Sequence, residues 1–169
     1  MGLPAMVELD VAPRATFLDT VSPLYERAPR FLERLADSRP FGTWAELFRE
    51  SLDIARNAPP DVQQELLDAH PRIGAPPASV SAMSFREQGY DQEQRDAIEA
   101  LGPLNDAYEA RFGFRYVVFV AGRPRSEIVP LLRAALDADP DEERARGLGD
   151  VVAIARARAR DLGLEEDLS

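Results

Sequence analysis

The sequence contains no cysteine and no lysine, and its 169 residues include a single histidine, His70. Without cysteine there is no disulfide, no thiolate nucleophile and no Cys-ligated zinc or iron–sulfur site. A lone histidine cannot build a multi-histidine metal site. All 20 cationic side chains are arginines. The absence of lysine excludes Schiff-base chemistry through a lysine amine.

The chain also lacks a surplus of positive charge and any long apolar run. Its net charge of −10 argues against nucleic-acid binding, because neutralising phosphates requires surplus cations. No window reaches the roughly 18 uninterrupted apolar residues that a membrane span needs. The N-terminal stretch from Met1 to Arg14 lacks the basic flank and apolar run of a secretory signal. We therefore expect a cytoplasmic protein that acts neither on nucleic acid nor in a membrane.

The length fits one globular domain over residues 1–169, with residues 1–13 forming a loose N-terminal segment. Apolar residues recur at helical spacing along nearly the whole chain, which predicts a compact all-α fold. Proline, glycine and aspartate punctuate that pattern. The predicted helices lie within residues 16–35, 43–55, 60–69, 98–112, 128–135 and 140–162. The first of these ranges is broken at Ser22-Pro23 and Ala28-Pro29, and Gly102-Pro103 is a candidate break in the range 98–112.

Two stretches depart from the helical pattern. Residues 71–83 form a long connection rich in proline, alanine and serine, and connections of that length in a compact domain are usually functional or mobile. Residues 114–120 are β-branched and aromatic but have no second strand to pair with, so they are predicted to form one extended internal segment. Their backbone N–H and C=O groups need partners, and a polar, planar ligand would satisfy them.

Two residues beside the long connection are candidates for acid–base chemistry. His70 ends a helix directly before Pro71, where a histidine commonly interacts with the free carbonyl groups of the helix end. It is also the one side chain suited without perturbation to proton transfer near neutral pH. Glu87 follows Ser84 with the spacing of a capping box, which alone would explain it. The sequence leaves the structural and the catalytic interpretation of both residues open.

The last predicted helix contains one arginine that faces the core. With about 100° per residue and Val151 at zero, the apolar residues from Leu148 to Leu162 cover an arc from about −60° to about +100°. Arg158 falls at about −20°, inside that arc, whereas Arg156 and Arg160 fall at about 140° and about 180° and are predicted to be solvated. An inward-facing arginine needs an anion, so Arg158 is either a buried ion-pair partner or a ligand clamp.

Taken together, these segments resemble a known family. The strings that carry the resemblance are Ala69-His-Pro-Arg-Ile-Gly74, Ser84-x-x-Glu87-Gln88 and Phe112-Gly-Phe-Arg-Tyr-Val-Val118, with Leu24-Tyr-Glu-Arg-Ala-Pro29, Arg39-Pro-Phe41 and Ile154-Ala-Arg-Ala-Arg158 further out. In this order they are similar to the decarboxylases of 2-oxo-4-hydroxy-4-carboxy-5-ureidoimidazoline (OHCU), an intermediate of urate catabolism. The resemblance covers most of the chain.

The resemblance implies an all-helical, homodimeric enzyme that decarboxylates OHCU to (S)-allantoin without a metal or organic cofactor. It implies catalytic roles for His70, Glu87 and Arg158. The residues that it assigns to substrate binding are Pro71, Ser84, Phe85, Arg86, Gln88, Tyr116, Val117, Val118, Phe119 and Val120. The chain departs from the family pattern at Arg30, where tryptophan is common, and at Ala157 and Ala159, where leucines flank the arginine.

The absence of a cofactor is chemically reasonable for this substrate. Its carboxylate is attached to the carbon next to an imine carbon, so the electrons left by departing CO₂ can flow into the imine. Two alternatives stay open at this point. One is a lyase or hydrolase that acts on another ureido or imidazole compound, and the other is a catalytically silent helical interaction module.

Overall fold

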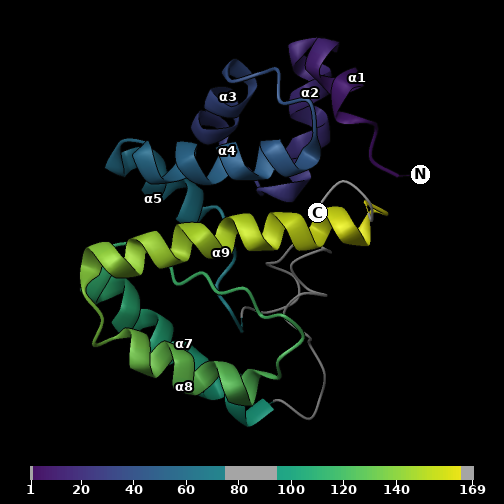
Figure 1. Ribbon diagram of the computed structural model, residues 1–169. Coiled ribbons are helices and arrows are strands. Elements are labelled where there is room, and N and C mark those ends of the chain that lie inside the picture. The colour runs from purple at the N-terminus through teal and green to yellow at the C-terminus, as the bar shows by residue number, and fades with distance from the viewer. Residues whose placement is uncertain (1, 75–94, 165–169) are drawn as a thin grey trace. The chain divides into compact units, whose positions relative to one another are not determined.

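The computed structural model describes residues 2–74 and 95–164, and the regular elements in these two ranges are all helical (Figure 1). This confirms the all-α prediction. None of the helices in the described part is long and apolar enough to cross a membrane. The segment predicted to be extended, residues 114–120, has no helical structure and pairs with no strand in those ranges, so it is the expected irregular internal segment.

The chain divides into two compact units. The first comprises residues 1–69 and 148–169, and the second comprises residues 70–147. The single-domain organisation stays a prediction of the sequence. The elements of the first unit are α1 (Met6–Val11), α2 (Arg14–Val21), the 3₁₀ helix η1 (Ser22–Leu24), α3 (Pro29–Asp37), α4 (Trp44–Asn57), α5 (Pro60–Asp68) and the C-terminal part of α9 (Pro140–Asp161). The second unit holds α7 (Arg95–Phe112), α8 (Arg125–Ala135) and the beginning of α9.

Local sequence signals account for three of the helix ends. The Thr43 side chain accepts a hydrogen bond of 3.1 Å from the Glu46 backbone N–H, as an N-cap residue should. Pro60 occupies the first turn of α5, where its missing N–H costs nothing. Gly113 ends α7 with a φ of +76°, a conformation that glycine adopts without steric penalty. These three boundaries confirm the sequence predictions.

Helix α7 passes through the candidate break at Gly102-Pro103 without interruption. A proline inside a helix cannot donate to the carbonyl four residues earlier, which here belongs to Glu99. Glu99 is exposed, so water can satisfy that carbonyl group. The continuous helix therefore survives because its proline falls on a solvated side.

The prediction of a loose N-terminal segment was wrong. Residues Met6–Val11 form α1, in which the Met6 and Leu9 side chains are buried. The Asp10 carboxylate accepts a 2.9 Å hydrogen bond from the Phe41 backbone N–H, which ties α1 to the loop before α4. A helix this short has little stability of its own, so packing rather than propensity fixes it.

Aromatic side chains fill much of the second unit beside the irregular segment. The Tyr108 ring on α7 lies 4.6 Å from the Phe112 ring, 5.8 Å from the Phe114 ring and 5.0 Å from the Tyr116 ring, centroid to centroid. Helices α7 and α8 pack side by side in this unit (Figure 1). The irregular segment is thus held against α7 by its aromatic residues.

Candidate functional site

The candidate site residues fall into three groups in the structure. His70, Pro71 and the segment from Tyr116 to Val120 belong to the second unit, whereas Arg158 belongs to the first. The residues Ser84, Phe85, Arg86, Glu87 and Gln88, and with them the capping box predicted at Ser84, lie outside the described residues.

His70 is buried, with 3% of its surface exposed, at the point where the chain leaves α5. The Arg115 guanidinium donates a 2.8 Å hydrogen bond from Nη1 to the His70 carbonyl oxygen. Because Arg115 directly precedes the Tyr116–Val120 segment, that bond brings two of the predicted site elements together.

The residues after His70 are attached to α7 by an ion-pair network. The Arg72 guanidinium contacts the carboxylates of Asp106, at 2.7 Å, and of Glu109. The same Glu109 carboxylate lies 3.5 Å from Nε of Arg115. The hydrogen bonds that Arg72 donates to the carboxylates of Glu109 and Asp106 raise the pKa of Arg72 above its ordinary value. Glu109 therefore contacts both Arg72, two residues after His70, and Arg115, which binds the His70 carbonyl group.

The irregular segment after α7 receives hydrogen bonds from the protein's own arginines. Arg146 donates from Nη1 to the Val117 carbonyl at 3.0 Å. Arg123 donates to the Phe119 carbonyl at 2.6 Å and to the Val120 carbonyl at 2.9 Å. The sequence suggested that a ligand would satisfy this backbone, but three of its carbonyl groups already have protein donors.

Arg146 is itself fixed by a buried carboxylate. Its guanidinium forms two hydrogen bonds from Nε to the Glu143 carboxylate, at 2.9 and 3.0 Å, and lies 5.0 Å from the Tyr116 ring centroid. The Tyr108 hydroxyl donates to the same carboxylate at 2.7 Å. Burial, and then the hydrogen bond to Glu143, raise the pKa of Tyr108 far above its ordinary value, so that hydroxyl stays protonated.

Arg158 points into the first unit, as the helical-wheel argument predicted, and only 1% of its surface is exposed. Its Nη1 donates to the carbonyl oxygens of Pro23, at 3.2 Å, and Leu24, at 3.1 Å. Its Nη2 donates to the Glu26 carboxylate at 2.8 Å. The anion that the burial of Arg158 requires is therefore present in the chain.

Glu26 reaches Arg158 from an unusual backbone conformation. Its φ of +57° lies in the left-handed region, which non-glycine residues seldom occupy. Such conformations typically cost about 1–3 kcal/mol and persist when surrounding contacts hold them. The carboxylate contact with Arg158 is one contact of this kind.

The other two arginines of the final helix behave differently from each other. Arg160 is exposed, as predicted. The prediction of a solvated Arg156 was wrong, because that side chain is half-buried with its guanidinium carbon 5.8 Å from the Phe48 ring centroid. Arg156 lies outside the apolar arc of α9, but the Phe48 ring on α4 covers part of its side chain.

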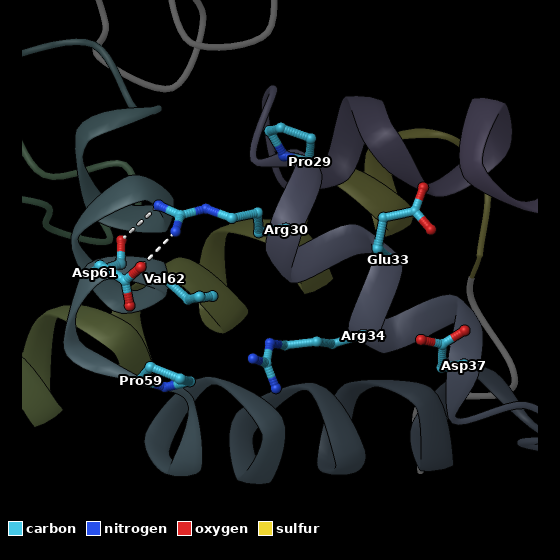
Figure 2. A pocket seen from close by; sticks show the side chains of 8 residues that line it. All are labelled: Pro29, Arg30, Glu33, Arg34, Asp37, Pro59, Asp61 and Val62. Atoms are coloured by element: carbon cyan, nitrogen blue, oxygen red, sulfur yellow. Dashed lines mark hydrogen bonds and ion pairs between the residues drawn. The ribbon is translucent and has the colours of Figure 1, made fainter.

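A surface hollow of about 570 Å³ opens between α3 and α5 in the first unit (Figure 2). Arg30, the position at which the chain departs from the family pattern, forms ion pairs there with Asp61, at 2.5 Å, and Glu65, at 2.6 Å. The hollow contains none of the predicted site residues. Its lining residues are Pro29, Arg30, Glu33, Arg34, Asp37, Pro59, Asp61 and Val62.

Sequence reasoning missed Glu26, Arg115, Arg123 and Arg146, the charged residues that hold the candidate site elements in place. Arg115 is 45 residues from the carbonyl group that it binds, and Arg146 is 29 residues from its carbonyl partner. No local pattern marks such pairs, because only the fold brings them together. Within the described ranges, no three His, Asp or Glu side chains gather closely enough to hold a metal ion.

Sequence comparison gives matches over most of the chain. A family model described as OHCU decarboxylase matches residues 10–160. The uric acid degradation bifunctional protein PucL of Bacillus subtilis is 30% identical over 95% of this chain, which spans 33% of that protein. The OHCU decarboxylase of Halalkalicoccus jeotgali is 28% identical over 95% of this chain and 92% of its own length. That of Xenopus laevis is 27% identical over 90% of both chains.

Two solved structures share the fold. A crystal structure of OHCU decarboxylase in the presence of (S)-allantoin has a TM-score of 0.68 and 21% identity, and the match covers 85% of this chain and 97% of that one. A crystal structure of (S)-allantoin synthase has a TM-score of 0.67 and 21% identity, over 94% of this chain and 54% of the other.

Proposed function

The chain belongs to the OHCU decarboxylase family, and from this premise we propose that it decarboxylates OHCU to (S)-allantoin and CO₂ in urate catabolism. The family match over residues 10–160 carries the proposal. The chain spans only a third of the bifunctional relative but about nine-tenths of the two decarboxylases. The proposed activity is therefore that of a carboxy-lyase.

The substrate itself supplies the electron sink for this reaction. The bond between the ring carbon and the carboxylate breaks, and its electron pair forms a double bond to the neighbouring imine carbon while the imine pair moves onto nitrogen. The resulting enol loses its hydroxyl proton, and protons add at the former imine carbon and nitrogen. Proton addition from one face gives (S)-allantoin. The protein has to orient the ring, guide the departing carboxylate and move protons, so we propose that it uses no cofactor.

We assign the proton transfers to His70. An imidazole changes its charge close to neutral pH, and burial excludes the solvent that would otherwise compete for the proton. In this proposal His70 polarises or deprotonates the substrate hydroxyl and shuttles the proton. Glu87, which the resemblance pairs with it, orients and charges the imidazole.

Arg158 is proposed to bind an anionic or carbonyl oxygen of the substrate. Its planar guanidinium suits such an oxygen, and the two backbone carbonyls and the Glu26 carboxylate hold it in one orientation. A guanidinium fixed in advance loses little conformational entropy when the substrate arrives.

The remaining contacts follow from the resemblance. Gln88 and the backbone of the Tyr116–Val120 segment are proposed to hold the ureido group and the ring amides. Three carbonyl groups of this segment are already bound by Arg146 and Arg123, which supports a rigid binding edge. The other residues proposed to line the substrate are Pro71, Ser84, Phe85 and Arg86. We further propose that the protein is a cytoplasmic homodimer.

The test is to add the protein to freshly generated OHCU and to follow the circular dichroism of allantoin formation. An enzyme-free sample measures the spontaneous reaction, and a His70→Asn variant controls for acceleration that does not involve the site. The proposal predicts a faster reaction that yields one enantiomer. A wild-type rate equal to the spontaneous rate would favour the silent interaction module instead.

A further inference from the structure

The segment from His70 to Gly74 is attached to one stripe of α7 at several points. Asn105 donates from Nδ2 to the Ile73 carbonyl at 3.0 Å, and Asp106 and Glu109 bind the Arg72 guanidinium. Residues 105 and 109 are one helical turn apart, so their side chains lie on the same face of α7. The irregular stretch that follows α5 is thus fixed by a helix from later in the chain.

Glu109 has the central place in this attachment. One of its carboxylate oxygens binds Arg72, and the other lies 3.5 Å from Nε of Arg115. Arg115 in turn donates to the His70 carbonyl oxygen at 2.8 Å. Gly113 turns the chain at the end of α7, which returns Arg115 to the side of the helix on which Glu109 lies. The carboxylate therefore contacts an arginine close to His70 in the sequence, Arg72, and another that binds the His70 carbonyl group, Arg115.

We propose that Glu109 is a positioning residue for the decarboxylation, which acts through Arg115 and Arg72 to fix the backbone that carries the His70 imidazole. The inference rests on the proposed function, in which His70 moves the protons. Glu109 has no assigned contact with the substrate. Its contribution is to hold the donor that binds the His70 carbonyl group.

The need for such a residue follows from where His70 lies. Helix α5 ends at Asp68, so the helical hydrogen-bond pattern no longer fixes the backbone at residue 70. A proton donor must stay within hydrogen-bond reach of its target, and a displacement of about 1 Å can lower a rate by about 100-fold. Loss of the Glu109 carboxylate would remove the ion-pair partner that Arg115 and Arg72 share, although Arg72 keeps its contact with Asp106, and so permit that displacement.

The experiment compares Glu109→Gln with the control Glu46→Gln. Both substitutions remove a partly exposed carboxylate that lies on a helix and pairs with arginine. The Glu46–Arg49 pair lies on α4 in the first unit. The measurements are kcat and KM for OHCU, the melting temperature, and the imidazole signal in a ¹H–¹³C NMR spectrum. His70 is the only histidine in the sequence, so that signal needs no assignment.

For Glu109→Gln we expect kcat to fall by about 10- to 100-fold with KM changed less than threefold. The imidazole signal should shift or broaden in the same variant, while Glu46→Gln matches the wild type in every measurement. In an Arg115→Met background the Glu109 substitution should have a smaller effect on kcat, because the two residues act in series.

A lower melting temperature with unchanged kcat and an unchanged imidazole signal would overturn the proposal and leave Glu109 as a structural ion-pair partner. Equal effects of Glu109→Gln in the wild-type and Arg115→Met backgrounds would also overturn it. The NMR arm does not depend on activity. A wild-type protein without decarboxylase activity would therefore contradict the proposed function, and the NMR arm would then still test whether Glu109 positions the His70 imidazole.

Discussion

Replacing Arg158 with lysine separates the ion-pair and the substrate-binding interpretations of that residue. Within the described part of the chain, Arg158 donates to two backbone carbonyls and to the Glu26 carboxylate. Lysine keeps the charge but has one nitrogen in place of the two that Arg158 uses, so it cannot reproduce this arrangement of donors. A neutral hydrogen bond contributes about 0.5–1.5 kcal/mol, and a charged one about 1.5–3 kcal/mol. Both carbonyl bonds come from a charged guanidinium, so if the ammonium keeps its bond to Glu26 and loses both of them, the free energy of unfolding falls by about 3–6 kcal/mol.

If Arg158 binds the substrate, the folded Arg158→Lys protein should also lose kcat/KM, in addition to the loss of stability. Losing a charge-assisted contact that forms in the transition state costs about 2–4 kcal/mol. At about 1.4 kcal/mol per factor of ten, kcat/KM should fall by about 30- to 700-fold. Urea unfolding gives the stability, and the circular dichroism assay, corrected for the folded fraction, gives kcat/KM. The matched control is Arg160→Lys on the same helix, which should stay within about 0.5 kcal/mol of wild type because Arg160 is exposed.

Two results would refute this reasoning. A folded Arg158→Lys protein with lowered stability and wild-type kcat/KM would show that the arginine serves only the ion pair with Glu26. Equal losses of kcat/KM in Arg158→Lys and Arg160→Lys would show that burial on the core face of α9 does not determine which arginine matters.

Three further predictions rest on single residues. His70→Asn should lower kcat by at least about 100-fold in the circular dichroism assay, while the free energy of unfolding, measured with urea, changes by only about 1–2 kcal/mol. A near-normal rate would refute the proton-transfer role. Stability should fall as the pH rises above about 10, because burial raises the pKa of Tyr25 above its ordinary 10.0, whereas the unfolded tyrosine ionises near that value. Tyr25→Phe should make that alkaline decline shallower in pH-dependent urea unfolding, and an unchanged slope would contradict the assignment. Gly113→Ala should destabilise the fold by about 1 kcal/mol, because its φ of +76° is unfavourable for alanine. No atom of the described residues lies within 4 Å of the added methyl group, so the cost comes from the backbone alone. An unchanged melting temperature would contradict this.

The helix positions were largely predictable because their signals are local. Thr43 caps a helix, Pro60 begins one and Gly113 ends one, and each effect depends on residues within one or two turns. Helix α1 was missed because six residues have too little intrinsic helicity to show a pattern. Its existence depends on burying Met6 and Leu9 against the rest of the first unit.

The candidate site was predictable only as a set of residue types. The sequence placed His70 at a helix end and Arg158 on a buried face, and the resemblance supplied their proposed roles. It could not identify Glu26 as the carboxylate beside Arg158, which is 132 residues away along the chain. It left open whether an anion from the protein or from a ligand would meet that arginine.

The sequence by itself determined the all-helical class, the inward face of α9 and the chemistry that a chain without cysteine or lysine can perform. These depend on periodicity and composition, which are properties of neighbouring residues. Tertiary structure alone decided that Arg115 holds the His70 carbonyl, that Arg146 and Arg123 bind the segment after α7, and that Arg156 lies against Phe48. Any of the 20 arginines could have formed such contacts with a carbonyl group or ring. Distant residues pair only when the packing of the helices brings them within hydrogen-bond distance.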